Sequence, residues 1–269
     1  MPDIAIDVAE QAGVGLDGKP RPTEDVVVTT GNAVALLDGA TEFRDGVPSG
    51  GWYAHRLAEQ LRAHLNGAPG GDLATLLARA IADVARAHRL QPHHAPSSTV
   101  AMLRWTAERV DALVLGDSPV VAFGRSGMDV VADRRLAELR AAGRLRTRAE
   151  VNRLRNTDGG FWVAEAEPTA TAHAVCVCWP RAELETVLLA TDGVAAGIDD
   201  YGLFDWPQLR LLARGHGAAA VLDAVRQAER SDPDGTRWPR AKRHDDQALA
   251  VIEFTKLSGV TQGHTPITS

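Results

Sequence analysis

The sequence predicts a single α+β domain with strands at both ends of the chain and amphipathic helices between them. In Asp3–Gln11 apolar side chains alternate with polar or small ones, as in a half-buried strand. Ala248–Phe254 is an apolar run near the other end, and Ala54–Leu65 carries apolar residues at helical spacing. With no repeat and no linker-like boundary, we expect one domain over residues 1–256 and a disordered tail at 257–269.

Composition narrows the class of protein. A net charge of -6 and a pI near 5.8 argue against a general nucleic-acid or membrane-surface binder. No apolar run is long enough to cross a bilayer, and the start of the sequence lacks the pattern of a signal peptide. Cys176 and Cys178 stand two apart in an apolar run, so we interpret them as reduced packing residues on one strand face. We therefore expect a cytoplasmic protein.

The first third of the chain predicts a hairpin followed by two helices. A Gly/Pro-rich loop ends in Arg21 and leads into Glu24, Asp25 and a strand at Val26–Thr30. Gly31-Asn32 is a turn signal, and the strand Ala33–Gly39 (AVALLDG) follows, so these two strands should pair. The helix over Ala54–Leu65 comes next, and Asp72 is a plausible N-cap for a second helix.

The remaining two thirds predict more strands, a helical insertion and a second pair of helices. Eight arginines lie between 133 and 156, in what we expect to be two short helices around Gly143. This arginine cluster either engages an anionic substrate or forms a solvated helix surface, and we favour the second interpretation. The other expected segments are strands at Ser98–Trp105, Arg109–Leu115, Val120–Gly124, Ala174–Val177 and Thr186–Ala190, a loop at Ala195–Asp205, and helices at Pro207–Ala213 and Ala218–Glu229.

Acidic residues stand beside five of these strands, where a rigid support could bring them together. They are Glu24, Asp25, Asp38, Asp117, Asp192, Asp245 and Asp246. Each Asp-Gly pair taken alone is more often a turn than a site. Several carboxylates at one end of a sheet would repel one another unless cations neutralise them. Mg²⁺ or Mn²⁺, which prefer oxygen ligands, would suit such a site, and two ions can activate a water for phosphoryl transfer.

The acidic motifs resemble, in order, those of the metal-dependent protein serine/threonine phosphatases of type 2C. The matching segments are Thr23-Glu24-Asp25, Asp38-Gly39, Ser97-Ser98-Thr99, Gly116-Asp117-Ser118-Pro119, Thr191-Asp192-Gly193 and Asp245-Asp246. The resemblance spans Lys19–Phe254. It implies a four-layer α-β-β-α sandwich with two central antiparallel sheets, and a variable flap at about residues 133–160.

The resemblance also implies roles for individual residues. Asp38 would bridge two metal ions and the carbonyl of Gly39 would bind one of them, while Asp192 and Asp245 would complete the shell of the other. Glu24 and Asp25 would act through ordered waters, and Asp117 would join Asp192 at a third ion. Asp246 is the alternative to Asp245 as ligand. Arg21 would grip the phosphate, with Lys19 as the alternative.

The expected function is therefore a Mn²⁺- or Mg²⁺-dependent phosphatase acting on phosphoserine or phosphothreonine in proteins, with a monomer favoured. The sequence departs from the family in Ala40-Thr41-Glu42 after Asp38-Gly39, in Pro119 in place of arginine and in Thr23 in place of asparagine. None of these changes removes a direct metal ligand. The alternatives are a catalytically silent signalling module with the same fold, and a phosphoesterase that acts on small molecules.

Overall fold

Two five-stranded sheets pack face to face at the centre of the protein. The computed structural model describes residues 4–14, 18–40, 46–240 and 242–254. All strand pairs in both sheets are antiparallel. The first sheet has the order β1 (Ile4–Gln11), β10 (Gln247–Phe254), β9 (Leu184–Ala190), β6 (Val120–Gly124), β7 (Gly127–Val131). The second has the order β2 (Asp25–Thr29), β3 (Ala33–Gly39), β4 (Ser98–Trp105), β5 (Arg109–Leu115), β8 (Val175–Pro180).

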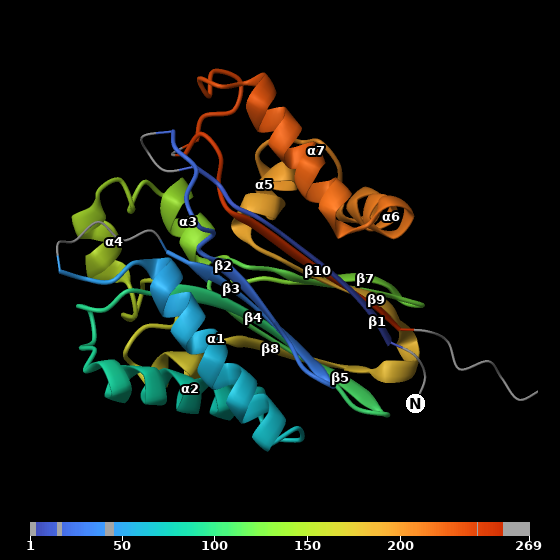
Figure 1. Ribbon diagram of the computed structural model, residues 1–269, viewed down its shortest axis with the longest axis horizontal. Helices are drawn as coiled ribbons and strands as arrows, with labels where there is room; N and C mark the ends of the chain where they lie inside the picture. The colour runs from blue at the N-terminus through green and yellow to red at the C-terminus, as the bar shows by residue number, and fades with distance from the viewer. Residues whose placement is uncertain (1–3, 15–17, 41–45, 241, 255–269) are drawn as a thin grey trace, which may run out of the picture.

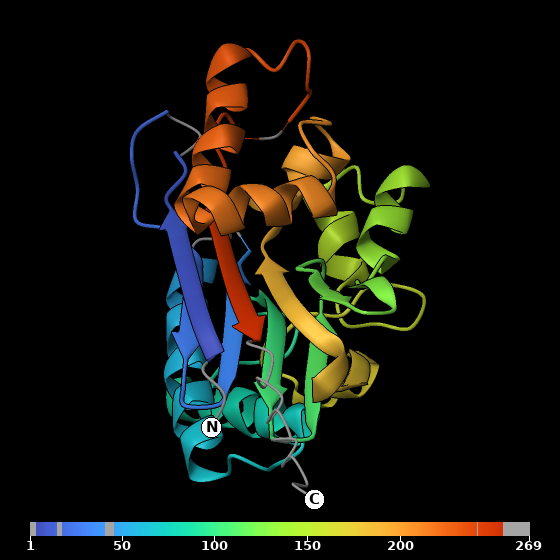
Figure 2. The same cartoon turned by 90° about the vertical axis from the view of Figure 1, so that its right-hand side faces the viewer.

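Helices cover both outer faces of the two sheets (Figure 1). One pair lies over the second sheet, three helices lie over the first, and two short ones stand beside the sheets (Figure 2). They are α1 (Gly50–Gly67) and α2 (Leu73–His88); α5 (Asp192–Asp199), α6 (Trp206–His216) and α7 (Ala218–Ser231); and α3 (Arg135–Ala141) and α4 (Arg148–Leu154). The predicted four-layer α-β-β-α sandwich is thus confirmed. Within the described residues, no helix is long and apolar enough to cross a membrane.

The strand β3 shows how alternation builds the layers. Val34 and Leu36 point between the two sheets, whereas Ala35 and Leu37 point towards α1 and α2. Because both faces are covered, the strand is a continuous apolar run rather than an alternating one. It buries every residue except Asp38, which is partly exposed at the end of the strand. The packing of β3 therefore fixes where that carboxylate emerges.

Capping residues set the start of the first two helices. The side chain of Ser49 accepts a hydrogen bond from the backbone of Trp52, and Asp72 accepts one from Thr75, as its predicted role requires. The two short helices predicted around Gly143 are also confirmed, as α3 and α4. On the opposite face, Val221 and Leu222 of α7 pack against Leu188 and Val251 of the first sheet.

The structure corrects three expectations. The helix α5 (Asp192–Asp199) takes in residues 195–199 of the expected loop, and the hairpin strand β7 was not predicted. Cys176 and Cys178 are free and share one face of β8, but that face is exposed. Their neighbours Val175 and Val177 do the packing instead. Residues 257–269 and the departures Thr41 and Glu42 lie outside the described residues.

Truncating a side chain between the sheets should destabilise the fold. Leu36 is completely buried, so Leu36→Ala is expected to lower the free energy of unfolding by about 2–5 kcal/mol through lost burial and a cavity. The matched control is Leu211→Ala on α6, where the side chain is 68% exposed and the expected change is below about 0.5 kcal/mol. Urea denaturation measures both; equal small effects would contradict the assigned core.

Candidate active site

Strand pairing brings the first acidic residues together. Asp25 at the start of β2 lies directly opposite Asp38 at the end of β3. The backbone N–H of Gly39 donates to the carbonyl of Glu24 at 3.1 Å, which continues the pairing by one step. A Cβ at Gly39 would lie 2.5 Å from the backbone carbon of Gly50, so only glycine allows α1 to approach the strand this closely.

A second pair of strands delivers Asp192, Asp245 and Asp246. Thr191 follows β9 and is held to β10, because its N–H donates to the carbonyl of Ala248 at 3.0 Å and its hydroxyl accepts from the N–H of the same residue at 2.9 Å. Asp192 then begins α5. A Cβ at Gly193 would lie 2.0 Å from the carbonyl oxygen of Asp246, so glycine is required where α5 meets the start of β10.

Asp117 belongs to the corner after β5. Gly116 there has φ of +92°, a conformation that favours glycine. The hydroxyls of Thr99 and Ser118 lie 2.6 Å apart and are buried, which joins two of the matched motifs. The carboxylate of Asp117 pairs with Arg140 of α3 at 3.4 Å. The insertion therefore reaches the site through an arginine from the predicted cluster.

Burial and mutual repulsion raise the pKa values of the central carboxylates. The pKa of Asp25 lies well above the ordinary range, because the side chain is buried and feels the charge of Asp192. Burial and the same neighbour raise the pKa of Asp38. For Asp192, burial followed by the charges of Asp245 and Asp117 raises the pKa to about 7. These carboxylates are therefore close enough to repel one another.

Asp25 in particular lacks the hydrogen bonds that a buried carboxylate needs. Neither of its oxygens makes a hydrogen bond of normal geometry in the described part of the chain, and the Thr191 hydroxyl only partly offsets the effect of burial on the pKa. A buried carboxylate without partners is costly when ionised. A bound cation or ordered water would satisfy it.

Basic side chains pair with the outer carboxylates. Arg21 donates from Nη1 to Glu24 and from Nη2 to Asp246, the second at 2.5 Å. Lys242 lies 2.6 Å from Asp245 through its Nζ and the Oδ1 atom. Among the residues that the structure describes, no ion pair joins Asp25, Asp38 or Asp192 to a basic side chain.

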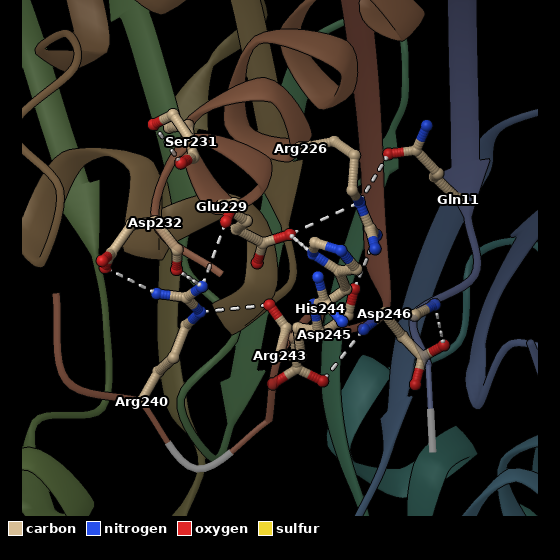
Figure 3. A network of polar contacts seen from close by, with 12 residues as sticks. Gln11, Arg226, Glu229, Ser231, Asp232, Arg240, Arg243, His244, Asp245 and Asp246 are labelled. Atoms are coloured by element: carbon tan, nitrogen blue, oxygen red, sulfur yellow. Dashed lines mark hydrogen bonds and ion pairs between the residues drawn. The ribbon is translucent and has the colours of Figure 1, made fainter. Parts of the chain in front are cut away.

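A buried polar network holds the segment that carries Asp245 and Asp246 (Figure 3). Arg226 of α7 donates to the carbonyl of Asp245 at 2.8 Å, and Glu229 contacts His244 Nδ1 at 3.1 Å. Burial raises the pKa of Glu229 to about 7, and burial together with the charge of Arg226 lowers the pKa of His244 to about 4. The N–H of Gly13 donates to Asp246 Oδ1 at 2.9 Å.

The donor set fits a hard divalent cation in its chemistry. It consists of carboxylates and a backbone carbonyl, the ligands that Mg²⁺ and Mn²⁺ prefer. A bound cation would satisfy the unpartnered oxygens of Asp25 and offset the charge that raises the pKa values of Asp38 and Asp192. As the side chains stand, however, no three His, Cys, Asp or Glu residues of the described chain are grouped to hold an ion. The pairs made by Arg21 and Lys242 take up oxygens of the set.

Comparison with solved structures identifies the fold. The catalytic domain of the serine/threonine phosphatase PstP in complex with two manganese ions is similar over 93% of this chain and 97% of its own, with a TM-score of 0.59 and 15% identity. PppA from Pseudomonas aeruginosa is similar over 93% of this chain and 97% of its own, with a TM-score of 0.60 and 16% identity. Stp1 from Staphylococcus aureus is similar over 95% of this chain and 96% of its own, with a TM-score of 0.60 and 13% identity.

The chain thus has the fold of the type 2C protein phosphatases. No family model and no curated protein sequence matches it. At these identities the likeness establishes the architecture and leaves activity to the residues of the site.

The structure brings Glu24, Asp25, Asp38, Asp192, Asp245 and Asp246 to one end of the sandwich, with Asp117 beside them. It adds Lys242, which the sequence analysis missed. The only sequence signal was a basic residue three positions before Asp245, in a polar loop. Arg226 and Glu229 were also missed, because they lie on a helix whose spacing predicts packing alone. Arg21 reaches the acids through Glu24 and Asp246, and Lys19 stays the alternative to it as a prediction.

The pH dependence of stability should report the repulsion around Asp192. Folding favours its neutral acid, since the pKa rises from about 3.9 in the unfolded chain to about 7. The contribution of neutral Asp192 to the stability of the folded state is fully present below pH 3.9, and it is lost as the pH rises through 7. Asn cannot ionise, so the Tm of metal-free Asp192→Asn relative to wild type should increase between pH 5 and pH 8, by at least about 2–4 °C.

The control is Asp200→Asn, which changes an exposed residue at the end of the same helix. Its Tm difference from wild type should stay constant over that range. Thermal denaturation in the presence of a chelator measures both series. A flat difference for Asp192→Asn would contradict the electrostatic assignment.

Proposed function

We propose that the protein is a Mn²⁺- or Mg²⁺-dependent serine/threonine phosphatase that hydrolyses phosphoserine and phosphothreonine in proteins. The observation that carries the proposal is the convergence of Asp25, Asp38 and Asp192, buried carboxylates whose pKa values are raised and which form no ion pair with a basic side chain in the described structure. The chain also shares its fold with the catalytic domain of a solved serine/threonine phosphatase. Repulsion of this kind is a cost to stability, and a metal site offers a reason to keep it.

The metal positions follow from the motifs. Asp38, the carbonyl of Gly39, Asp192 and Asp245 would hold two ions, and Asp117 with Asp192 a third. Divalent ions at such a site supply an activated water and neutralise charge on the phosphoryl group. Asp246 is less suited to ligation, because it accepts from Gly13 and Arg21 through both oxygens. Asp245 is therefore the ligand we favour.

Arg21 is suited to bind the phosphate. Its side chain is 21% exposed, and Glu24 and Asp246 orient its guanidinium at the edge of the acidic cluster. A guanidinium presents more donors than these two contacts use, so it can donate to phosphoryl oxygens from the same position. Glu24 is held in turn by the N–H of Gly51 at the start of α1, at 3.4 Å. Glu24 and Asp25 would orient waters.

One observation favours the alternative of a catalytically silent binding module. Arg21 and Lys242 already pair with Glu24, Asp245 and Asp246 and offset part of their charge without a metal. A site stabilised in this way could bind a phosphorylated partner through its cations and leave the phosphate intact. Calorimetry showing phosphopeptide binding by a protein that binds no Mn²⁺ would favour this alternative.

The test is Mn²⁺-dependent release of phosphate from a phosphothreonine peptide. Asp38→Ala is expected to reduce turnover at least 10³-fold, on the order expected when a metal ligand is removed from a hydrolytic site. Asp200→Ala, which removes a carboxylate outside the site, should leave turnover within about twofold. Full activity of Asp38→Ala, or inactive wild type with excess Mn²⁺, would contradict the proposal. A panel of small phosphate monoesters run in parallel separates the small-molecule phosphoesterase.

A further inference from the structure

Lys242 is a cationic side chain directed into the acidic cluster from the loop between α7 and β10. Its Nζ lies 2.6 Å from Asp245 Oδ1, and its side chain is only 22% exposed. Asp245 uses the same oxygen to accept the backbone N–H of Asp246 at 2.9 Å. The ammonium thus occupies an oxygen of a residue that the motifs assign to a metal.

The position of Lys242 is built by the surrounding loop. On one side of it, Arg240 donates to Asp232 Oδ2 at 3.0 Å and to the carbonyl of Glu229 at 3.1 Å. On the other, His244 contacts Glu229 and its carbonyl accepts from Val14 at 3.1 Å. Figure 3 shows the contacts of Arg240 and His244 converging on the end of α7. The loop is anchored at both sides of the lysine, unlike that of an ordinary surface residue.

The charges around Lys242 come from three separate elements. Burial alone would lower its pKa, but the charges of Asp245, Asp38 and Asp192 outweigh burial and raise it. Asp245 precedes β10, Asp38 lies at the end of β3, and Asp192 begins α5. The motifs assign the same three residues to one of the two metal ions. An exposed pair at i, i+3 would be worth little, whereas the Lys242–Asp245 pair is partly buried and feels the charges of two further carboxylates.

We propose that Lys242 is a tethered cation that takes the place of one divalent ion, at the position shared by Asp38, Asp192 and Asp245. The inference rests on the proposed function for the identity of that position. A divalent ion can bind there only when the ammonium leaves Asp245, so the two cations compete. Lys242 then determines how many metal ions the protein holds and how tightly.

Isothermal titration of the chelator-treated protein, residues 1–269, with MnCl₂ tests the competition. Lys242→Met keeps the length of the side chain and removes the charge. It should bind one more Mn²⁺ per chain than wild type or bind Mn²⁺ at least about tenfold more tightly, because a unit charge a few ångströms away is lost. Lys242→Arg keeps the charge and should resemble wild type, as should Arg214→Met, which removes an exposed charge on α6.

A thermal measurement covers the case in which Lys242→Met folds poorly without metal. Removing the ammonium leaves the carboxylates unneutralised, so Mn²⁺ should raise the Tm of Lys242→Met more than that of wild type. Identical Mn²⁺ stoichiometry and affinity, or identical Tm increments, would overturn the proposal. A gain of Mn²⁺ binding in a protein with no phosphatase activity would support the tethered cation and contradict only the proposed function.

Discussion

The mutual repulsion of Asp25, Asp38 and Asp192 is the constraint around which the site is organised. Burial and the charges of neighbouring carboxylates raise the pKa of each, and none forms an ion pair with a basic side chain in the described part of the protein. Such a cluster opposes folding whenever its members ionise, so the rest of the structure must hold it in place. Packing between the sheets and against the helices provides that stability.

Strand register and close contacts at glycines position the carboxylates of the site. Asp25 meets Asp38 because β2 and β3 pair in that register, and Asp192 meets the Asp245 segment because Thr191 extends the pairing of β9 with β10. The Arg226–Glu229 network then fixes the backbone of Asp245 from the outer helix layer. Elements from both sheets thus contribute to one end of the sandwich, and the outer pairs made by Arg21 and Lys242 balance part of its charge.

Much of this was predictable from the sequence. The strand at Ala33–Gly39 was found with its bounds, because its apolar run ends sharply in Asp38-Gly39 and a turn precedes it. The helix α5 was not, since Gly193 and Gly197 are weak helix formers. The structure needs glycine there to bring α5 close to the carbonyl of Asp246 and to the side chain of Val225. The edge strand β7 is short and mostly exposed, so it carried no burial pattern.

The acids of the site were predictable because each stands beside a recognisable strand, but their partners were not. Lys242 reaches Asp245 through a polar loop without periodicity, and its position depends on contacts made by α7 far away in the sequence. Ion pairs formed by such loops are tertiary features. Sequence patterns therefore located the carboxylates and left open which cations neutralise them.

Anomalous scattering at the manganese edge, from crystals grown with MnCl₂, would test the central claim most directly. A cluster assembled to bind metal predicts an anomalous peak coordinated by Asp38, with Asp192 or the carbonyl of Gly39 as a further ligand. Crystals soaked at millimolar Mn²⁺ that show no peak within coordination distance of Asp38 would contradict it.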